Sequence, residues 1–279
     1  MKTKTYVVTG SASGIGKALI TRLAENNIVF AGYRNKEHEV DLSLLSPNIY
    51  PFYIDYTKPE TIKEAADYIL NKCTKIDTLV NIAGCVVAGP MECIDIDELK
   101  RQFNVNVFGH IDLTQRLIPI LEDGKIINIS SMASFGIFPF IAPYCASKKC
   151  LDILFNSLLI ENKKNIKVVS IKPGVISTPL WSKSVNENSK YFEKYGEYAG
   201  EMKYIISNAH KNEKTGLCVD KVVDTILKAD RAKTPKLSYT VGSDAFFARI
   251  LSNLPQGIIN GLIKIGIKLK KCTKKRPCV

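Results

Sequence analysis

The segment TYVVTGSASGIGKALI (residues 5–20) indicates the fold class, because it combines a strand, a glycine-rich turn and the start of a helix. Residues 5–10 are an apolar, β-branched run that ends in glycine, which predicts a short buried strand. Residues 14–27 carry apolar side chains at helical spacing, which predicts an amphipathic helix. The segment therefore predicts the first strand–turn–helix unit of an α/β protein.

The three glycines of this turn follow the spacing G-x-x-x-G-x-G. Glycine permits a tight turn and lets backbone N–H groups approach a pyrophosphate at the N-terminus of the next helix. An ordinary turn is the alternative, but the position between first strand and first helix favours a nucleotide site. The loop residues expected to bind a cofactor are Gly10, Ser11, Ser13, Gly14, Ile15 and Gly16.

Further apolar runs predict six more strands, and helical patterns separate most of them. Such alternation indicates βαβ units and a parallel sheet that is covered on both faces. We therefore predict a single doubly wound, Rossmann-type α/β domain over residues 1–244, with about seven parallel strands. The strand runs are 28–33, 49–54, 78–83, 125–130, 166–171 and 237–242, and the helical patterns are 60–73, 95–121, 143–162 and 218–229.

Two segments depart from this regular alternation. The connection between the second and third strands is short, so we expect a stunted helix there. Residues 180–215 are polar and without a clear period, which predicts an irregular insertion on the substrate side of the domain.

The composition is that of an ordinary globular protein, with 46% hydrophobic and 24% charged residues in 279. A formal net charge of +12 by itself favours nucleic acid or an anionic membrane as a partner. However, residues 245–279 hold eight basic residues and no acidic one, which leaves +4 on residues 1–244. We expect no nucleic-acid partner and treat 245–279 as a basic amphipathic tail.

The eight cysteines form no C-x-x-C pair, so we expect no metal site. The N-terminus lacks a secretory apolar segment, and no run approaches the roughly 18 apolar residues of a spanning helix. These features predict a cytoplasmic protein with reduced thiols. Cys145 and Cys150 are either reactive thiols or small buried side chains. The three histidines lack any ligand spacing and receive no role.

The segment APYCASKKC (residues 142–150) places Tyr144 and Lys148 four residues apart, on one face of a predicted helix. An ammonium group near a phenol lowers the pKa of the phenol and makes an acid–base group usable near neutral pH. The same pair also fits an ordinary amphipathic helix, so its meaning depends on the rest of the chain.

Six motifs in order resemble the short-chain dehydrogenase/reductase family over about residues 4–180. The motifs are TGSASGIG (9–16), NIAG (81–84), NVFG (106–109), NISSMAS (128–134), YCASK (144–148) and PGVISTPL (173–180). Within the family, NIAGCVVAGPMECI (81–94) and IFPFIAPYCASK (137–148) are most similar to the retinol and 17β-hydroxysteroid dehydrogenase-like branch. The NIAG motif has Ile82 where the family usually has asparagine, so that position is left out of the site.

The resemblance implies an oxidoreductase that interconverts a carbonyl and an alcohol by hydride transfer. In it, Tyr144 is the general acid or base, and Lys148 lowers its pKa and holds the nicotinamide ribose. Ser131, thirteen residues before the tyrosine, is preferred over Ser130 for binding the substrate oxygen.

The same resemblance implies that Asn106 supports a water molecule that links Lys148 to solvent. Asn104, two residues earlier, is the competing candidate.

The cofactor is expected to be NADP rather than NAD. The second predicted strand ends in AGYRN (31–35), without the carboxylate that usually binds the ribose of NAD. Arg34 is placed to hold a 2′-phosphate, although a solvated surface arginine is the alternative. Asp55 resembles the adenine-contacting aspartate of the family, with a capping carboxylate as the alternative. The other implied cofactor contacts are Asn81, Ala83, Gly84, Tyr144, Lys148, Pro173, Gly174, Val175, Ile176 and Thr178.

The substrate is expected to be small and lipophilic, because residues 135–141 are almost all apolar. Packing in the core is the other explanation of this segment. A non-catalytic NADP(H)-binding sensor is the alternative function, but it has no need of a complete proton relay. A nucleotide-sugar epimerase or dehydratase is disfavoured, since such relatives carry a G-x-x-G-x-x-G loop and a longer C-terminal domain.

In the tail, Ile258, Leu262, Ile265 and Leu269 form one helical stripe, opposite Asn260, Lys264, Lys268 and Lys271. Such a helix either packs on its own domain or lies on an anionic membrane surface. Cys272 and Cys278 lie among the basic residues and are candidates for acylation. A homo-oligomer is also compatible with the sequence.

Overall fold

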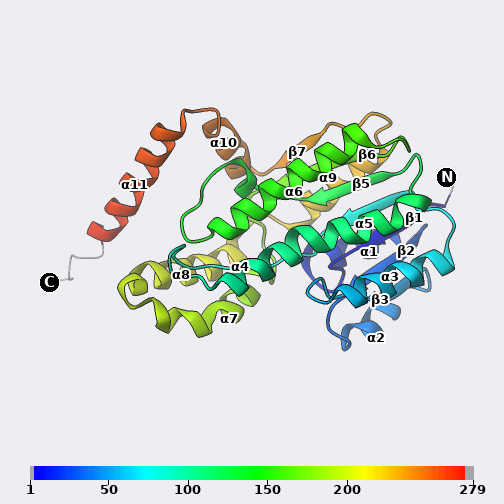
Figure 1. Cartoon of the computed structure of the whole chain (residues 1–279), viewed down its shortest axis with the longest axis horizontal. Helices are drawn as coiled ribbons and strands as arrows, with labels where there is room; N and C mark the ends of the chain where they lie inside the picture. The colour runs from blue at the N-terminus through cyan, green and yellow to red at the C-terminus, as the bar shows by residue number, and fades with distance from the viewer. Residues whose placement is uncertain (1–2, 274–279) are drawn as a thin grey trace.

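The computed structural model describes the backbone of residues 3–273 and the side chains of residues 3–189 and 196–266. In this part of the chain a seven-stranded sheet has the order β3-β2-β1-β4-β5-β6-β7, and every strand pair is parallel (Figure 1). The strands are β1 (Thr5–Val8), β2 (Ile28–Tyr33), β3 (Ile49–Tyr53), β4 (Thr78–Asn81), β5 (Lys125–Ile129), β6 (Lys167–Pro173) and β7 (Ser238–Val241).

Helices cover both faces of the sheet. Because successive side chains of a strand point to opposite faces, each central strand contributes to an apolar cluster on both sides. Val8 and Val80 contribute to one apolar cluster, with helices α1 (Gly14–Leu23) and α9 (Val219–Arg231). Their neighbours on the strands contribute to the second cluster, with α3 (Pro59–Lys72), α5 (Gly109–Leu117) and α6 (Ala142–Glu161). The predicted doubly wound parallel sheet of about seven strands is confirmed.

Two helical connections around this sheet can be compared with the sequence prediction. One agrees with it and the other does not. Helix α2 (His38–Ser43) has six residues, as the short connection predicts. The predicted single helix over 95–121 is wrong, because it is divided into α4 (Ile96–Phe103), a π-helical turn (Asn104–Phe108), α5 and a 3₁₀ turn (Ile118–Ile120). A π turn inserts an extra residue into the helical repeat, and such turns are frequent at functional sites.

The predicted irregular insertion over 180–215 is also corrected. It forms helix α7 (Leu180–Phe192), a 3₁₀ turn (Glu193–Tyr198) and helix α8 (Ala199–Thr215). The two helices pack on each other below α6, apart from the sheet (Figure 1). Polar side chains of α7 bind loops rather than the sheet, so the segment lacks the apolar period of a core helix.

The C-terminal segment divides into two helices. Helix α10 (Ser243–Leu251) packs on the domain, with Ala245 fully buried, so the packed domain extends beyond residue 244. Helix α11 (Gln256–Thr273) extends away from the body (Figure 1).

The apolar stripe of α11 does not dock on the domain within the described part of the chain. The exposed fractions of Ile258, Leu262 and Ile265 are 52%, 53% and 56%. The side chains of Leu269 and Cys272, and all of Cys278, lie outside the described residues. Across residues 3–273, no helix is both long and apolar enough to cross a membrane.

Candidate active site

Most of the expected site residues line one cleft of about 330 Å³ at the carboxyl ends of the strands. Its position, where the strand order reverses between β1 and β4, is where doubly wound sheets bind ligands. Tyr144, Lys148 and Ser131 lie in this cleft together with the glycine loop and Arg34. The structure thus brings together residues that are more than 100 positions apart in the chain.

Tyr144 and Lys148 lie in the first two turns of α6 and share one of its faces, as their spacing predicts. The Lys148 Nζ atom lies 5.8 Å from the centre of the Tyr144 ring. The same ammonium donates a 2.8 Å hydrogen bond to the carbonyl of Ile129, at the end of β5, and the residue is only 4% exposed. Lys148 is therefore fixed between the tyrosine and the strand end.

The electrostatics of the pair differ from the expectation that Lys148 lowers the pKa of Tyr144. Burial raises the pKa of Tyr144 to about 12, and a hydrogen bond with Ser131 opposes that rise. Burial lowers the pKa of Lys148 to about 8, with Asp152 acting in the opposite direction. Asp152 is itself paired with Lys172 at 2.7 Å. Desolvation is the largest influence on the pKa of both side chains, and it acts in opposite directions on the phenol and the ammonium.

Asn106 is buried in the π-helical turn, whereas Asn104 is only partly buried. The Asn106 side chain accepts a 2.9 Å hydrogen bond from the amide of Cys85 and donates to the Cys85 carbonyl (3.1 Å) and to Ser147 Oγ (3.0 Å). A Cβ atom at Gly84 would lie 3.4 Å from Asn106 Oδ1 and 3.6 Å from Lys148 Nζ. Gly84 therefore lies against both Asn106 and Lys148, which come from different helical segments.

The glycine loop has the backbone that its sequence requires. Gly10 and Gly14 have φ values of 68° and 52°, in the left-handed region that favours glycine. A Cβ atom at Gly16 would lie 2.1 Å from the carbonyl oxygen of Gly10, so only glycine fits there. The loop therefore requires glycine at these three positions, which is the pattern of a pyrophosphate-binding turn.

Most of the expected cofactor contacts line the cleft, and three do not. Ser11 is buried, with its amide bound to Gly32 and its hydroxyl bound to Val8. Asn81 is buried in the sheet and donates to Asn128 at 2.8 Å. Gly16 shapes the loop without lining the cleft. The expected residues that line it are Gly10, Ser13, Gly14, Ile15, Arg34, Asp55, Ala83, Gly84, Tyr144, Lys148, Pro173, Gly174, Val175, Ile176 and Thr178.

Asp55 lines the cleft, but its carboxylate makes the local hydrogen bonds that are expected of a capping residue. Its Oδ1 atom accepts hydrogen bonds from the amide (2.9 Å) and the hydroxyl (2.7 Å) of Thr57. The carboxylate therefore stabilises the turn that precedes α3, and an adenine contact stays a prediction.

The two cysteines beside the tyrosine have raised pKa values because of burial. A raised pKa reduces the thiolate fraction on which thiol reactivity depends. Of the two explanations, the structure favours small, partly or fully buried side chains at Cys145 and Cys150.

Some functional side chains had no signal in the sequence. His110 is fully buried in α5 and lies 2.8 Å from the carbonyl oxygen of Ala83, in the loop that borders the cleft. Asp244 of α10 accepts a 2.7 Å hydrogen bond from the amide of Val175, on the opposite side of the cleft. Both residues position cleft-lining backbone from distant elements, and such long-range contacts leave no local pattern.

The buried His110 gives the protein a predictable pH dependence. Burial lowers its pKa from 6.5 to about 3, so the folded state binds fewer protons than the unfolded state in this range. The stability that depends on neutral His110 is complete above pH 6.5 and is lost progressively as the pH falls toward 3. Between pH 7 and pH 5 we expect the wild type to lose about 2 kcal/mol more unfolding free energy than His110→Asn. Parallel pH profiles in urea denaturation of the two proteins would contradict this.

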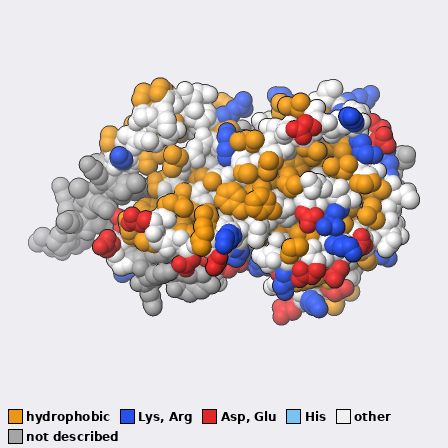
Figure 2. All heavy atoms as spheres, viewed as in Figure 1, with side chains coloured by type: hydrophobic (Ala, Val, Ile, Leu, Met, Phe, Trp, Pro, Cys, Tyr) orange, Lys and Arg blue, Asp and Glu red, His pale blue; other side chains and the backbone are white. Residues whose placement is uncertain are grey.

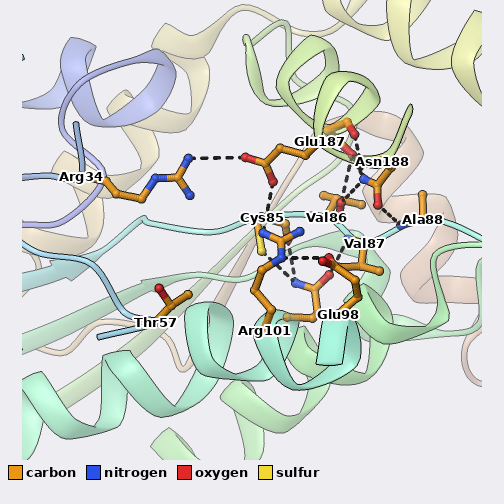
Figure 3. A network of polar contacts seen from close by, with 12 residues as sticks. Arg34, Thr57, Cys85, Val86, Val87, Ala88, Glu98, Arg101, Glu187 and Asn188 are labelled. Atoms are coloured by element: carbon orange, nitrogen blue, oxygen red, sulfur yellow. Dashed lines mark hydrogen bonds and ion pairs between the residues drawn. The ribbon is translucent and has the colours of Figure 1, made fainter. Parts of the chain in front are cut away.

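Helix α7 contributes a second group that sequence reasoning missed. Figure 3 shows Glu187 between Arg34 and Arg101, with Asn188 bound to the backbone of Val86 and Ala88. Arg34 is therefore placed at the cleft, as expected, but it is paired with a carboxylate from the other side of it.

Comparisons with known proteins agree with this geometry. A family model described as short chain dehydrogenase matches residues 4–189. An NADPH-dependent 3-dehydrocapnine reductase of Ornithobacterium rhinotracheale is 33% identical, covering 96% of this chain and 98% of the relative. A 3-ketodihydrosphingosine reductase of Bacteroides thetaiotaomicron is 26% identical, covering 95% and 98%. The crystal structure of a short-chain dehydrogenase from Streptomyces avermitilis aligns with a TM-score of 0.74, 24% identity and 99% of both chains.

Proposed function

This chain belongs to the short-chain dehydrogenase family, and we propose that it reduces a ketone on an amphiphilic, lipid-like molecule with NADPH as the hydride donor. Membership of the family makes it an NAD(P)-dependent oxidoreductase that acts on a carbonyl–alcohol pair. The observation that carries the proposal is the joint placement of Ser131, Tyr144 and Lys148 in one cleft with the glycine cradle.

The cleft residues fit the phosphates of NADPH. Gly10, Ser13 and Gly14 line the cleft in the turn that precedes α1, where backbone N–H groups can bind a pyrophosphate. Arg34 lies at the end of β2, where a carboxylate would select NAD, and a guanidinium suits a 2′-phosphate. The 33%-identical relative is named as NADPH-dependent, which supports the same choice. When bound, the cofactor supplies the hydride.

The chain itself supplies orientation and the proton. Ser131 and Tyr144 line the same cleft, and we assign both hydroxyls to one substrate oxygen. The raised pKa of Tyr144 means that the phenol carries the proton that a carbonyl oxygen would receive. The positive charge of Lys148 stabilises the phenolate that remains after donation. A non-catalytic sensor requires no such set of a serine, a tyrosine and a lysine in the cleft.

The walls of the cleft near Tyr144 support an apolar substrate. Phe138 and Ile141 line it from the segment before α6, and Leu180 and Trp181 line it from α7. Other residues of 135–141 point elsewhere; Phe135, for example, lies under the Lys172 ammonium at 4.7 Å. The apolar segment is therefore part pocket wall and part packing. Two relatives are named as reductases of 3-dehydrocapnine and of 3-ketodihydrosphingosine, which supports an amphiphilic ketone.

The proposed function is tested by NADPH consumption with purified protein. The panel pairs 3-ketodihydrosphingosine and 3-dehydrocapnine with short-chain ketones and with steroid ketones. We expect kcat/KM to be highest for the amphiphilic ketones. Equal rates across the panel would contradict the substrate class, and no oxidation of NADPH with any member would contradict the function.

We also propose that α11 lies on an anionic, cytoplasmic membrane surface. The described side chains of its apolar stripe are more than half exposed. All charged residues in 245–279 are basic. Each basic residue near such a surface adds about 1 kcal/mol of attraction. A homo-oligomer is proposed from the apolar side chains that gather over α5 and α6, including Ile153 and Ile160 (Figure 2).

Sedimentation with vesicles tests the role of the tail. We expect the full chain to pellet with phosphatidylglycerol vesicles at low salt, to be released at high salt, and to remain soluble with neutral vesicles. The full-length variant Leu262→Glu/Ile265→Glu should lose most of this binding, while a chain ending near residue 255 should lose all of it. If the full chain stays in the supernatant with anionic vesicles, the membrane proposal is wrong. Velocity sedimentation without vesicles measures the oligomeric state.

A further inference from the structure

Helix α7 is fixed against the loop that follows β4 by two side chains one turn apart. Asn188 is fully buried; its amide donates to the Val86 carbonyl at 2.8 Å, and its oxygen accepts from the Ala88 amide at 3.3 Å. Ser184 Oγ donates to the same Val86 carbonyl at 3.1 Å. These contacts hold one face of α7 on the backbone of the cleft wall.

The adjacent face of α7 carries Lys183 and Glu187, also one turn apart, and both reach across the cleft. Lys183 Nζ lies 3.3 Å from Ser13 Oγ, in the glycine loop. Glu187 Oε1 lies 3.4 Å from Arg34 Nη2, at the end of β2. The two side chains therefore stand at the positions where the chain offers its phosphate-binding groups.

Glu187 is held more firmly on its other side. Its second oxygen, Oε2, lies 3.2 Å from Arg101 Nη1, and Arg101 is anchored by Glu98 at 2.9 Å (Figure 3). The Arg101 side chain is 24% exposed, whereas that of Arg34 is 52% exposed. An ion pair in the more solvated position is weaker. Glu187 can therefore give up Arg34 and keep its partner Arg101.

We propose that Glu187 is a specificity-determining residue, whose carboxylate competes with the 2′-phosphate of the cofactor for Arg34. The inference rests on the proposed binding of NADPH at Arg34. Two anions cannot share one half-exposed guanidinium without repulsion, and a phosphate accepts paired N–H bonds better than a single carboxylate oxygen at 3.4 Å. Glu187 thus lowers the affinity for NADPH while it leaves the affinity for NADH nearly unchanged.

The opposite role of the same carboxylate predicts a different result. If Glu187 accepts hydrogen bonds from the ribose hydroxyls of NADH, it replaces the carboxylate that β2 lacks. Removing its charge would then weaken the binding of NADH and 5′-AMP. The two roles are separated by the sign of the change and by the ligand that changes.

The experiment is calorimetric titration of Glu187→Gln with adenosine 2′,5′-bisphosphate, 5′-AMP, NADPH and NADH. These adenosine probes isolate the 2′-phosphate from all chemistry at the nicotinamide. We expect the bisphosphate and NADPH to bind about three- to tenfold more tightly than to the wild type at low salt. The gain should shrink at 0.5 M salt, and 5′-AMP and NADH should change little. Weaker binding of 5′-AMP would overturn the proposal in favour of the ribose role.

Two further variants make the result specific. Glu98→Gln removes a carboxylate from Arg101 without touching Arg34, so it should leave the bisphosphate affinity unchanged. In the Arg34→Ala background, Glu187→Gln should lose most of its effect. An equal gain in Glu98→Gln, or an undiminished gain without Arg34, would overturn the proposal. If Glu187→Gln changes nothing while Arg34→Ala still weakens the bisphosphate, competition is wrong and the NADPH site stands.

Discussion

Tyr144→Phe is expected to lower the kcat for ketone reduction by about 10²–10⁴-fold and to leave NADPH affinity nearly unchanged. The substitution removes only the phenolic hydroxyl, while the ring keeps its place in α6. A protein-supplied proton is then lost, whereas the cofactor contacts at the glycine loop and Arg34 remain. Steady-state kinetics with the best ketone of the panel and calorimetry with NADPH measure the two quantities.

Tyr239→Phe provides the matched control for that substitution. Tyr239 lies on β7, and its hydroxyl accepts a hydrogen bond from the amide of Lys236, outside the cleft. Its loss should change kcat by less than about twofold, since surface and peripheral changes have small effects. Comparable turnover in Tyr144→Phe and the wild type would remove Tyr144 from the mechanism.

Arg34→Asp is expected to weaken NADPH by about 10- to 100-fold and NADH far less. A charge-assisted hydrogen bond contributes roughly 1.5–3 kcal/mol, and the introduced carboxylate adds repulsion toward the 2′-phosphate. Arg22→Asp makes the same charge change on an arginine paired with Asp224, away from the cleft, and should leave the ratio of the two affinities as it is. An NADPH-to-NADH ratio that does not move in Arg34→Asp would assign the arginine to the solvated surface.

The sequence predicts those features that are set by local periodicity or by a short motif. The buried strands appear as largely apolar runs because a parallel sheet covered on both faces buries the side chains on both sides of each strand. Tyr144 and Lys148 share a face because they are four residues apart in one helix. The loop of Gly10 and Gly14 is recognisable because few residues other than glycine adopt its backbone.

The rest depends on contacts between distant residues, which leave no local pattern. Helix α7 was missed because its polar residues bind Val86 and Arg34, about 100 and 153 positions away. The side-chain direction of Asn81 follows from its partner on the neighbouring strand, Asn128. The raised pKa of Tyr144 follows from burial, which a sequence motif does not measure.

The membrane and oligomer proposals, the cytoplasmic location and the adenine contact of Asp55 stay predictions. Each of them involves contact with another molecule, whereas the structure describes a single chain. The same limit applies to the choice of ketone, because Phe138 and Trp181 define an apolar wall without defining one substrate.

Hydride transfer from NADPH to an amphiphilic ketone can be followed directly with deuterium. NADPH carrying deuterium on the reactive carbon of its nicotinamide is incubated with the protein and 3-ketodihydrosphingosine, and the product is examined by mass spectrometry. We predict one deuterium on the carbinol carbon of the alcohol formed by the wild type, and strongly reduced product with Tyr144→Phe. An amphiphilic alcohol without deuterium, or NADPH that is bound but transfers no deuterium to any ketone of the panel, would contradict the account.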